Sequence, residues 1–140
     1  MLNFHEQLAA GLDQLRGYAE DRMTSRVRVR RPGPPGAPVP GQLERPTWTT
    51  PHPDLPFRLD GTASSDSGSQ RVRIGEYVFE GATNIGHVPA LTRDLRDDDL
   101  IEVYAGEWAG TVWRVVKAVG ADQKTARRLP LVEAMRPKEW

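Results

Sequence analysis

Apolar side chains near the N-terminus recur with the spacing of an α-helix. Between residues 3 and 23 most charged side chains fall on other faces, and the apolar stripe is Phe4, Leu8, Leu12, Leu15 and Ala19. Asn3 and Glu6 have the spacing of a capping box, which predicts that the helix begins at residue 3. Because Gly11 and Gly17 weaken an isolated helix, we expect the stripe to pack against one side of the domain.

From Ser25 the apolar positions alternate with a period of two. Val27 and Val29 point to one face and arginines to the other, which predicts a β-strand over residues 25–31. Residues 32–70 then hold nine of the twelve prolines and a Gly/Ser-rich stretch. Proline removes backbone donors, so this segment is predicted to be a long extended loop with one short strand near residues 57–59.

The remainder, residues 71–134, reads as a series of short strands separated by turn signals. Residues 71–79 resemble one strand bent by a bulge at Gly75, and further strands are predicted over 100–104, 111–119 and 125–134. Many short strands and a single helix are typical of a small β-barrel. The alternation predicts that its core contains Val27, Val29, Val72, Ile74, Ile101, Val103, Val112, Val116, Leu129 and Leu131.

The predicted fold is therefore mainly β, a small β-barrel with one N-terminal α-helix and a long Pro/Gly-rich loop extension. All 140 residues belong to one domain, with the helix at 3–23, barrel strands at 25–31 and 71–134, the extended loop at 32–70 and a C-terminal tail at 135–140. The sequence holds neither a signal-peptide pattern nor an apolar run that could span a membrane, so we expect no membrane partner.

Composition narrows the function classes further. The 19 Lys and Arg residues balance 19 Asp and Glu residues, so there is no basic excess of the kind that holds proteins to nucleic acid. The chain has no cysteine, which excludes disulfides, thiol nucleophiles and thiolate metal sites. A reducing cytoplasm is compatible with this composition.

Catalytic and metal-binding patterns are missing from the sequence. His5, His52 and His87 have no partner at a recurrent metal spacing, and the acidic run 97–99 reads as a solvated turn. No phosphate-binding glycine loop and no nucleophile elbow occur. We therefore expect no enzyme activity, no metal and no cofactor.

Two groups of side chains are candidates for an interaction surface. Arg26, Arg28 and Arg30 form a basic strand face, which indicates solvated surface or an acidic protein partner; nucleic acid would need exposed aromatic side chains beside it. The second group consists of tryptophans on predicted surface segments, which are either interface anchors or folded back on their own barrel: Trp48, Trp108 and Trp140. Trp113 lies in a predicted strand and is assigned to the core.

Residues 97–140 resemble the C-terminal half of a family of small actinobacteriophage virion proteins, the head-to-tail stopper or head-closure connector proteins. The stretches that carry the resemblance are AGEWAGTVWRV and ADQKTARRLP, and a short helix followed by SRVRVRRPG is similar to the opening of that family. The resemblance implies a structural virion protein at the head-tail interface, present in the host cytoplasm before assembly. The closest alternatives are a tail-completion or tail-terminator protein and, from another class, an oligonucleotide-binding barrel.

The resemblance also implies partners. The chain would form a six- or twelvefold ring between the portal-bound adaptor and a tail-terminator or tail-tube protein, and packaged double-stranded DNA would pass through without specific binding. We expect the loop 32–70 and the tail from residue 136 to be ordered by other subunits, with Trp48 and Trp140 as anchors. The arginine face would meet carboxylates of a neighbour, or those of the 97–99 turn.

Overall fold

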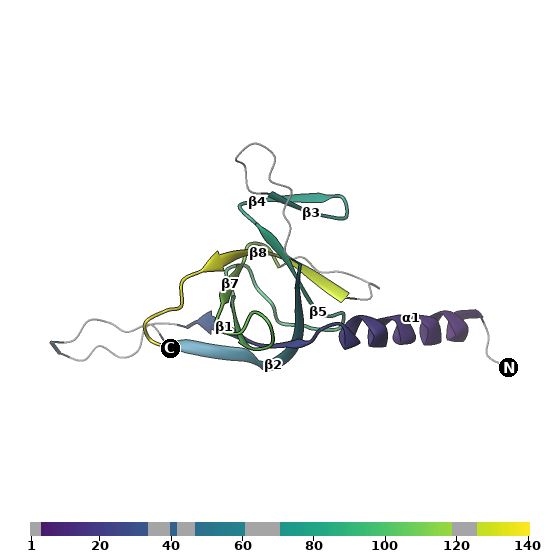
Figure 1. The fold of residues 1–140 in the computed structure, drawn as a ribbon, viewed down its shortest axis with the longest axis horizontal. Coiled ribbons are helices and arrows are strands. Elements are labelled where there is room, and N and C mark those ends of the chain that lie inside the picture. The colour runs from purple at the N-terminus through teal and green to yellow at the C-terminus, as the bar shows by residue number, and fades with distance from the viewer. Residues whose placement is uncertain (1–3, 34–39, 42–46, 61–70, 119–125) are drawn as a thin grey trace.

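Antiparallel strands close into a barrel in the computed structural model of the chain (Figure 1). The structure describes residues 4–33, 40–41, 47–60, 71–118 and 126–140. Each strand pairs with the next around the barrel, and the last pairs with the first, in the order β1 (Ser25–Pro32), β2 (Trp48–Asp60), β5 (Asn84–Pro89), β8 (Ala126–Ala134), β7 (Val112–Val115) and β6 (Leu100–Ala105). The predicted mainly β barrel with one N-terminal helix is confirmed.

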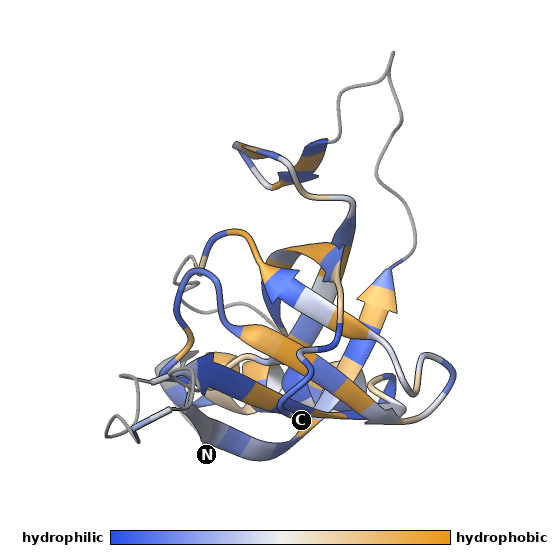
Figure 2. Cartoon of the chain, turned by 90° about the vertical axis from the view of Figure 1, so that its left-hand side faces the viewer, coloured by the Kyte–Doolittle hydropathy of each residue, from blue (hydrophilic) through white to orange (hydrophobic). Residues whose placement is uncertain are grey.

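Alternate side chains of the strands fill the barrel interior. In Figure 2, which colours the cartoon by hydropathy, hydrophobic and hydrophilic segments follow one another along the strands. Of the predicted core residues, those on β1, β6 and β8 are confirmed, since each is almost completely buried. The cluster also contains residues that we did not predict for it, including Phe57, Val88, Leu95 and Val115.

The assignment of Val116 to the barrel core is wrong. Ile101 lies opposite Trp113 and Val115 lies opposite Leu131, so the inward side chains of β7 are Trp113 and Val115. Val116 packs instead against a second cluster outside the barrel. The run of β-branched residues at this point has no clear alternation, which is why its inward face could not be read from the sequence.

The prediction that residues 32–70 form only a loop with a short strand is wrong for residues 48–60. These residues form β2, which pairs with β1 along its length and with β5 near Asp60, and its Phe57 is completely buried. Prolines are tolerated because the register with β1 shifts twice and because the proline-rich half of β2 has no second ladder partner. Residues 34–39, 42–46 and 61–70 lie outside the described residues.

Residues 71–79 do not form one bent strand. They belong to a hairpin of β3 (Arg71–Ile74) and β4 (Tyr77–Glu80), and Gly75 has a positive φ of 60° in the turn between them. Val72 and Ile74 are buried, but in a separate cluster with Ala82 on the outside of the barrel, so their assignment to the barrel core is also wrong. The hairpin stands above the barrel in Figure 1.

The predicted helix is present as α1 (Phe4–Asp21), but it does not cover a side of the barrel. It meets the barrel at its C-terminal end and projects away from it (Figure 1), and Leu8 and Leu15 are 56% and 53% exposed. Among the side chains that the structure describes, none from α1 belongs to the barrel core, because the closed barrel already covers its own apolar interior. No helix among the described residues is long and apolar enough to cross a membrane.

Candidate functional site

The arginines of β1 lie on the outside of the barrel, as their alternation with buried valines predicts. Val27 and Val29 are completely buried, whereas the side chains of Arg26, Arg28 and Arg30 emerge beside β2 and β6. We call these arginines, with the carboxylates and aromatic rings that contact them, the β1 face. The face spans from the base of α1 towards the end of the barrel that holds the C-terminus.

Arg26 forms a two-point ion pair with Asp54 of β2. Its Nε and Nη2 donate to the two carboxylate oxygens at 2.8 and 2.6 Å, and the hydroxyl of Tyr104 donates to the same carboxylate. These bonds, first the one from Arg26 and then the one from Tyr104, lower the pKa of Asp54 to about 2. The pKa of Arg26 is raised for the same reason, so both groups stay charged at every physiological pH.

Glu102 of β6 is the centre of the β1 face. One of its oxygens accepts hydrogen bonds from Arg30 at 3.0 and 3.2 Å and lies 3.5 Å from Arg28, and the other lies 3.1 Å from Nη1 of Arg136. Its side chain is only 4% exposed. Three guanidinium groups therefore converge on one buried carboxylate, and this cluster has a net charge of +2.

Aromatic rings complete the face. The guanidinium of Arg28 lies 4.3 Å from the ring centre of Tyr104, and that of Arg30 lies 4.6 Å from the ring of Trp140. Trp140 also contacts Trp48 edge to face, with the ring centres 5.3 Å apart. The indole N–H groups of Trp48 and Trp140 are buried and have no hydrogen-bond partner.

Five of the six predicted site residues therefore come together, and Trp108 does not. Trp108 lies in the loop between β6 and β7, is 37% exposed and has no ring contact with the arginines among the described residues. Trp140 packs on Trp48 and Arg30 of its own chain, which agrees with the alternative that these rings fold back on their own barrel. The ordering of the tail by other subunits stays a prediction.

Sequence reasoning missed the acidic partners of the arginines. Glu102 lies directly opposite Arg28 across the β1–β6 ladder, and the alternation of residues 100–105 already places Glu102 and Tyr104 on the outward face. Asp54 could not be found in this way because its strand was not predicted. Of the carboxylates in the 97–99 turn, only Asp99 bonds to a β1 arginine, and that arginine is Arg31.

A second polar group lies on the outside of β2, β5 and β8, where Arg58, His87 and Arg128 are directly opposite one another. His87 Nε2 lies 2.7 Å from a carboxylate oxygen of Asp60. Burial lowers the pKa of His87, although the bond to Asp60 opposes the shift. The neutral imidazole therefore dominates at neutral pH.

Neither the β1 face nor the polar group around His87 gives much support for a catalytic or metal-binding site. The described residues contain no group of three or more His, Asp or Glu side chains that could hold a metal ion. The β1 face consists of ion pairs, of guanidinium groups over aromatic rings and of one edge-to-face pair of rings. The absence of an enzyme activity and of a cofactor stays a prediction.

Comparison with known proteins gives a family but no relative of known role. The sequence profile of a family described as "Family of unknown function (DUF6093)" matches residues 15–132. No curated protein and no solved structure matches the chain.

Proposed function

We propose a structural, non-catalytic role for this chain, which belongs to the DUF6093 family of unknown function. The role is that of a subunit of the bacteriophage head-tail connector, a head-to-tail stopper that forms a ring, closes the DNA-filled head and offers the tail a docking surface. The partners are other copies of the chain, the portal-bound adaptor and a tail-terminator or tail-tube protein. DNA passes through without specific binding.

The observation that carries the proposal is the uncovered apolar stripe of α1. Leu8 and Leu15 are more than half exposed on a helix that stands away from the barrel. An 18-residue helix with two internal glycines is marginal on its own in water, so it needs a partner surface. A small barrel that keeps such a helix free of its own core is suited to assembly with other chains.

Two further features support the proposal. The stretch AGEWAGTVWRV, which carries the resemblance to stopper proteins, forms the end of β6, the loop after it and β7. The chain as a whole is neutral, and a channel without a large basic excess does not hold back the DNA that it must release. Both features support a connector protein in general, and neither favours the stopper over the tail-completion role.

The experiment is removal of the gene from the replicon that encodes it, followed by complementation. We expect heads that lose their DNA, together with unattached tails in electron micrographs, and full rescue by the wild-type gene. The double variant Leu8→Ser/Leu15→Ser is expected to fail in rescue, whereas Leu91→Ser, which changes an equally exposed leucine of the barrel, is expected to succeed.

Other outcomes separate the alternatives. Heads that keep their DNA beside malformed tails would assign the tail-completion role instead. Normal yields of intact particles without the gene would contradict any role in the connector.

One observation favours the rival class, an oligonucleotide-binding barrel. Tyr104 and Trp140 lie beside Arg28 and Arg30, so the aromatic side chains that the sequence did not place near the arginines are present. Against this, each of the two rings is already covered by a guanidinium, and Glu102 neutralises part of the charge. Salt-dependent binding of short single strands at physiological ionic strength would favour the rival, and its absence favours the connector.

A further inference from the structure

Charge is divided unevenly between α1 and the rest of the chain. The helix holds four carboxylates, those of Glu6, Asp13, Glu20 and Asp21, and one arginine, Arg16, which gives a net charge of −3. Because the whole chain is neutral, all other residues together carry +3. A neutral protein with separated charges attracts a second copy of itself when the two charged regions can meet.

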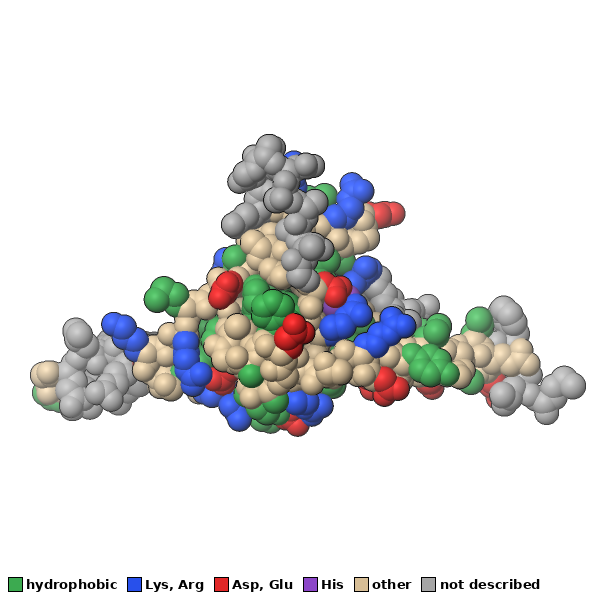
Figure 3. All heavy atoms as spheres, in the orientation of Figure 1, with side chains coloured by type: hydrophobic (Ala, Val, Ile, Leu, Met, Phe, Trp, Pro, Cys, Tyr) green, Lys and Arg blue, Asp and Glu red, His purple; other side chains and the backbone are tan. Residues whose placement is uncertain are grey.

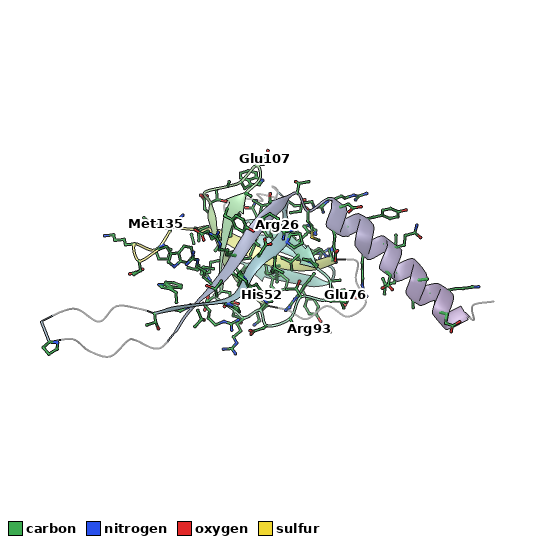
Figure 4. The ribbon with its side chains drawn as sticks, turned by 90° about the horizontal axis from the view of Figure 1, so that it is seen from below. Arg26, His52, Glu76, Arg93, Glu107 and Met135 are labelled. Carbon is green, nitrogen blue, oxygen red and sulfur yellow. The ribbon has the colours of Figure 1, made fainter. Side chains whose placement is uncertain are left out.

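The two charged regions lie at opposite ends of the molecule. α1 extends from one end of the long axis, and the C-terminus lies at the other end (Figure 1). Figure 4 shows Met135 on the side of the barrel away from α1. The guanidinium groups around Glu102 belong to this second end, because Arg30 and Arg136 both contact the ring of Trp140. Within one chain, α1 and the arginine cluster therefore do not meet.

The acidic side chains of α1 form a stripe of their own. Glu6, Asp13 and Glu20 recur every seven residues, which is two helical turns, so they share one face. The side chain of Asp13 is 77% exposed, and its contact with Arg16 is a long one at 3.7 Å. Figure 3 shows acidic side chains along the helix and blue basic side chains at several places on the barrel.

The opposite end offers both charge and apolar surface. Arg28, Arg30 and Arg136 share the single carboxylate of Glu102, so this cluster has a net charge of +2. Lys138 and Glu139, which follow in the tail, cancel each other. Met135, next to Arg136, is 92% exposed and is the most exposed large apolar side chain described.

We propose that α1 of one copy binds the Glu102 arginine cluster of a second copy, with its acidic stripe against Arg28 and Arg136. The proposal rests on the proposed function and names the contact between neighbouring subunits. Because the two surfaces are different, pairing leaves one surface free on each copy, the helix on one and the arginine cluster on the other, and the contact repeats head to tail. A repeated heterologous contact closes into a ring when its rotation allows it.

The helix of a second copy fits the Glu102 arginine cluster better than nucleic acid does, and the helix of the same chain does not reach the cluster. The arginines are already partly neutralised, so a helix with carboxylates at fixed spacing complements the cluster better than a phosphate backbone with its high charge density. An 18-residue helix is about 27 Å long, which is long enough to reach across the end of a neighbouring barrel. Leu8 and Leu15 lie on the opposite face of the helix from the acidic stripe, so this contact leaves them free for another chain of the assembly.

The test is sedimentation velocity of the purified full chain over a range of protein and salt concentrations. We expect self-association that weakens as salt rises, because the contact is largely electrostatic. A chain that stays monomeric at low salt and high protein concentration overturns the proposal. That result would leave the gene-removal experiment unaffected, so the failure of this contact is distinguishable from failure of the connector role.

Charge-reversal variants locate the contact. Asp13→Arg and Arg136→Glu are each expected to raise the dissociation constant by about tenfold or more, and the double variant in one chain is expected to recover most of the loss. Arg71→Glu makes the same charge change on the exposed side of β3, away from both ends, and is expected to have little effect. Equal effects of Arg71→Glu and Arg136→Glu would overturn the assignment.

The absence of cysteine permits a direct check of the geometry. Ala10→Cys places a thiol on the exposed side of α1 between Glu6 and Asp13, and Met135→Cys places one beside the arginine cluster. We expect a mixture of the two variants, each shown by circular dichroism to be folded, to form mixed disulfide dimers under mild oxidation. Predominant pairing of Ala10→Cys chains with each other would show a contact between helices and overturn the proposal.

Discussion

Arg31 and Asp99 form a buried two-point ion pair that ties β1 to the loop before β6. Nε and Nη2 of Arg31 donate to the two oxygens of Asp99 at 2.8 and 3.0 Å, and the backbone N–H of Arg96 donates to the same carboxylate at 2.9 Å. The side chain of Asp99 is 1% exposed. The sequence predicted that the acidic turn 97–99 is solvated. Asp97 and Asp98 do face solvent, whereas Asp99 is buried and has a structural role.

We expect Asp99→Asn to lower the free energy of unfolding by about 3 kcal/mol, because it leaves a largely buried guanidinium without its counter-charge. The matched control is Asp98→Asn, since Asp98 pairs with Arg114 at the surface, where ion pairs contribute about 0–1 kcal/mol. Denaturant titration of both variants measures the difference. Equal stability of the two variants would contradict a structural role for Asp99.

Gly86 is the position where a single methyl group should be most damaging. A Cβ there would lie 2.5 Å from Cδ1 of Leu131 and 2.8 Å from Cε2 of Phe57. We expect Gly86→Ala to cost about 1–3 kcal/mol, as overpacking of a filled core does. Gly17→Ala, which adds its methyl to open space on α1, is expected to stabilise the helix by up to about 1 kcal/mol. Thermal unfolding of the two variants should therefore shift in opposite directions.

Leucines of α1 and of the barrel should differ sharply in their effect on the free chain. Leu129 is completely buried, so Leu129→Ala is expected to cost about 2–5 kcal/mol. Leu15→Ala removes a side chain that is half exposed and is expected to cost less than about 1 kcal/mol in dilute solution. A loss of comparable size at Leu15 in a monomer would mean that the helix packs on its own barrel.

Stability should fall as the solution becomes acidic through the pKa of unfolded histidine. The folded pKa of His87 lies below its ordinary value of 6.5, first because of burial and then because of Arg58 and Arg128, with Asp60 acting against them. The unfolded chain therefore binds the extra proton first, and this contribution is lost as pH falls below about 6.5. We expect His87→Gln to flatten the slope of stability against pH between about 7 and 5. An unchanged slope would mean that His87 does not titrate differently in the two states.

The sequence was sufficient to predict burial where the alternation within a single strand determines which side chains point inward. The alternation around Val27 and Val29 identified both the buried valines and the outward arginines. It was insufficient where the answer depends on another segment, as for Asp54, whose contact with Arg26 requires the register of a strand rich in proline. Gly75 is compatible with a bulge and with a turn, and only the pairing of β3 with β4 decides between them.

The position of α1 illustrates a second limit. An amphipathic pattern predicts that a helix has an apolar face, but it does not identify the surface that covers the face. The barrel closed without the helix, so Leu8 and Leu15 remained exposed. The same pattern that failed to place the helix therefore provides the main support for a role in assembly.

The most direct test of the claim that another chain covers α1 is amide hydrogen exchange along this helix, with the barrel strands as an internal reference. In the dilute free chain we expect the amides of Leu8, Leu12 and Leu15 to exchange with little protection while those of Val29 and Leu129 are strongly protected. In the assembled ring the helix amides should become protected as well. Strong protection of α1 in a dilute monomer, or its continued exposure in assembled particles, would contradict the claim that another chain covers this helix.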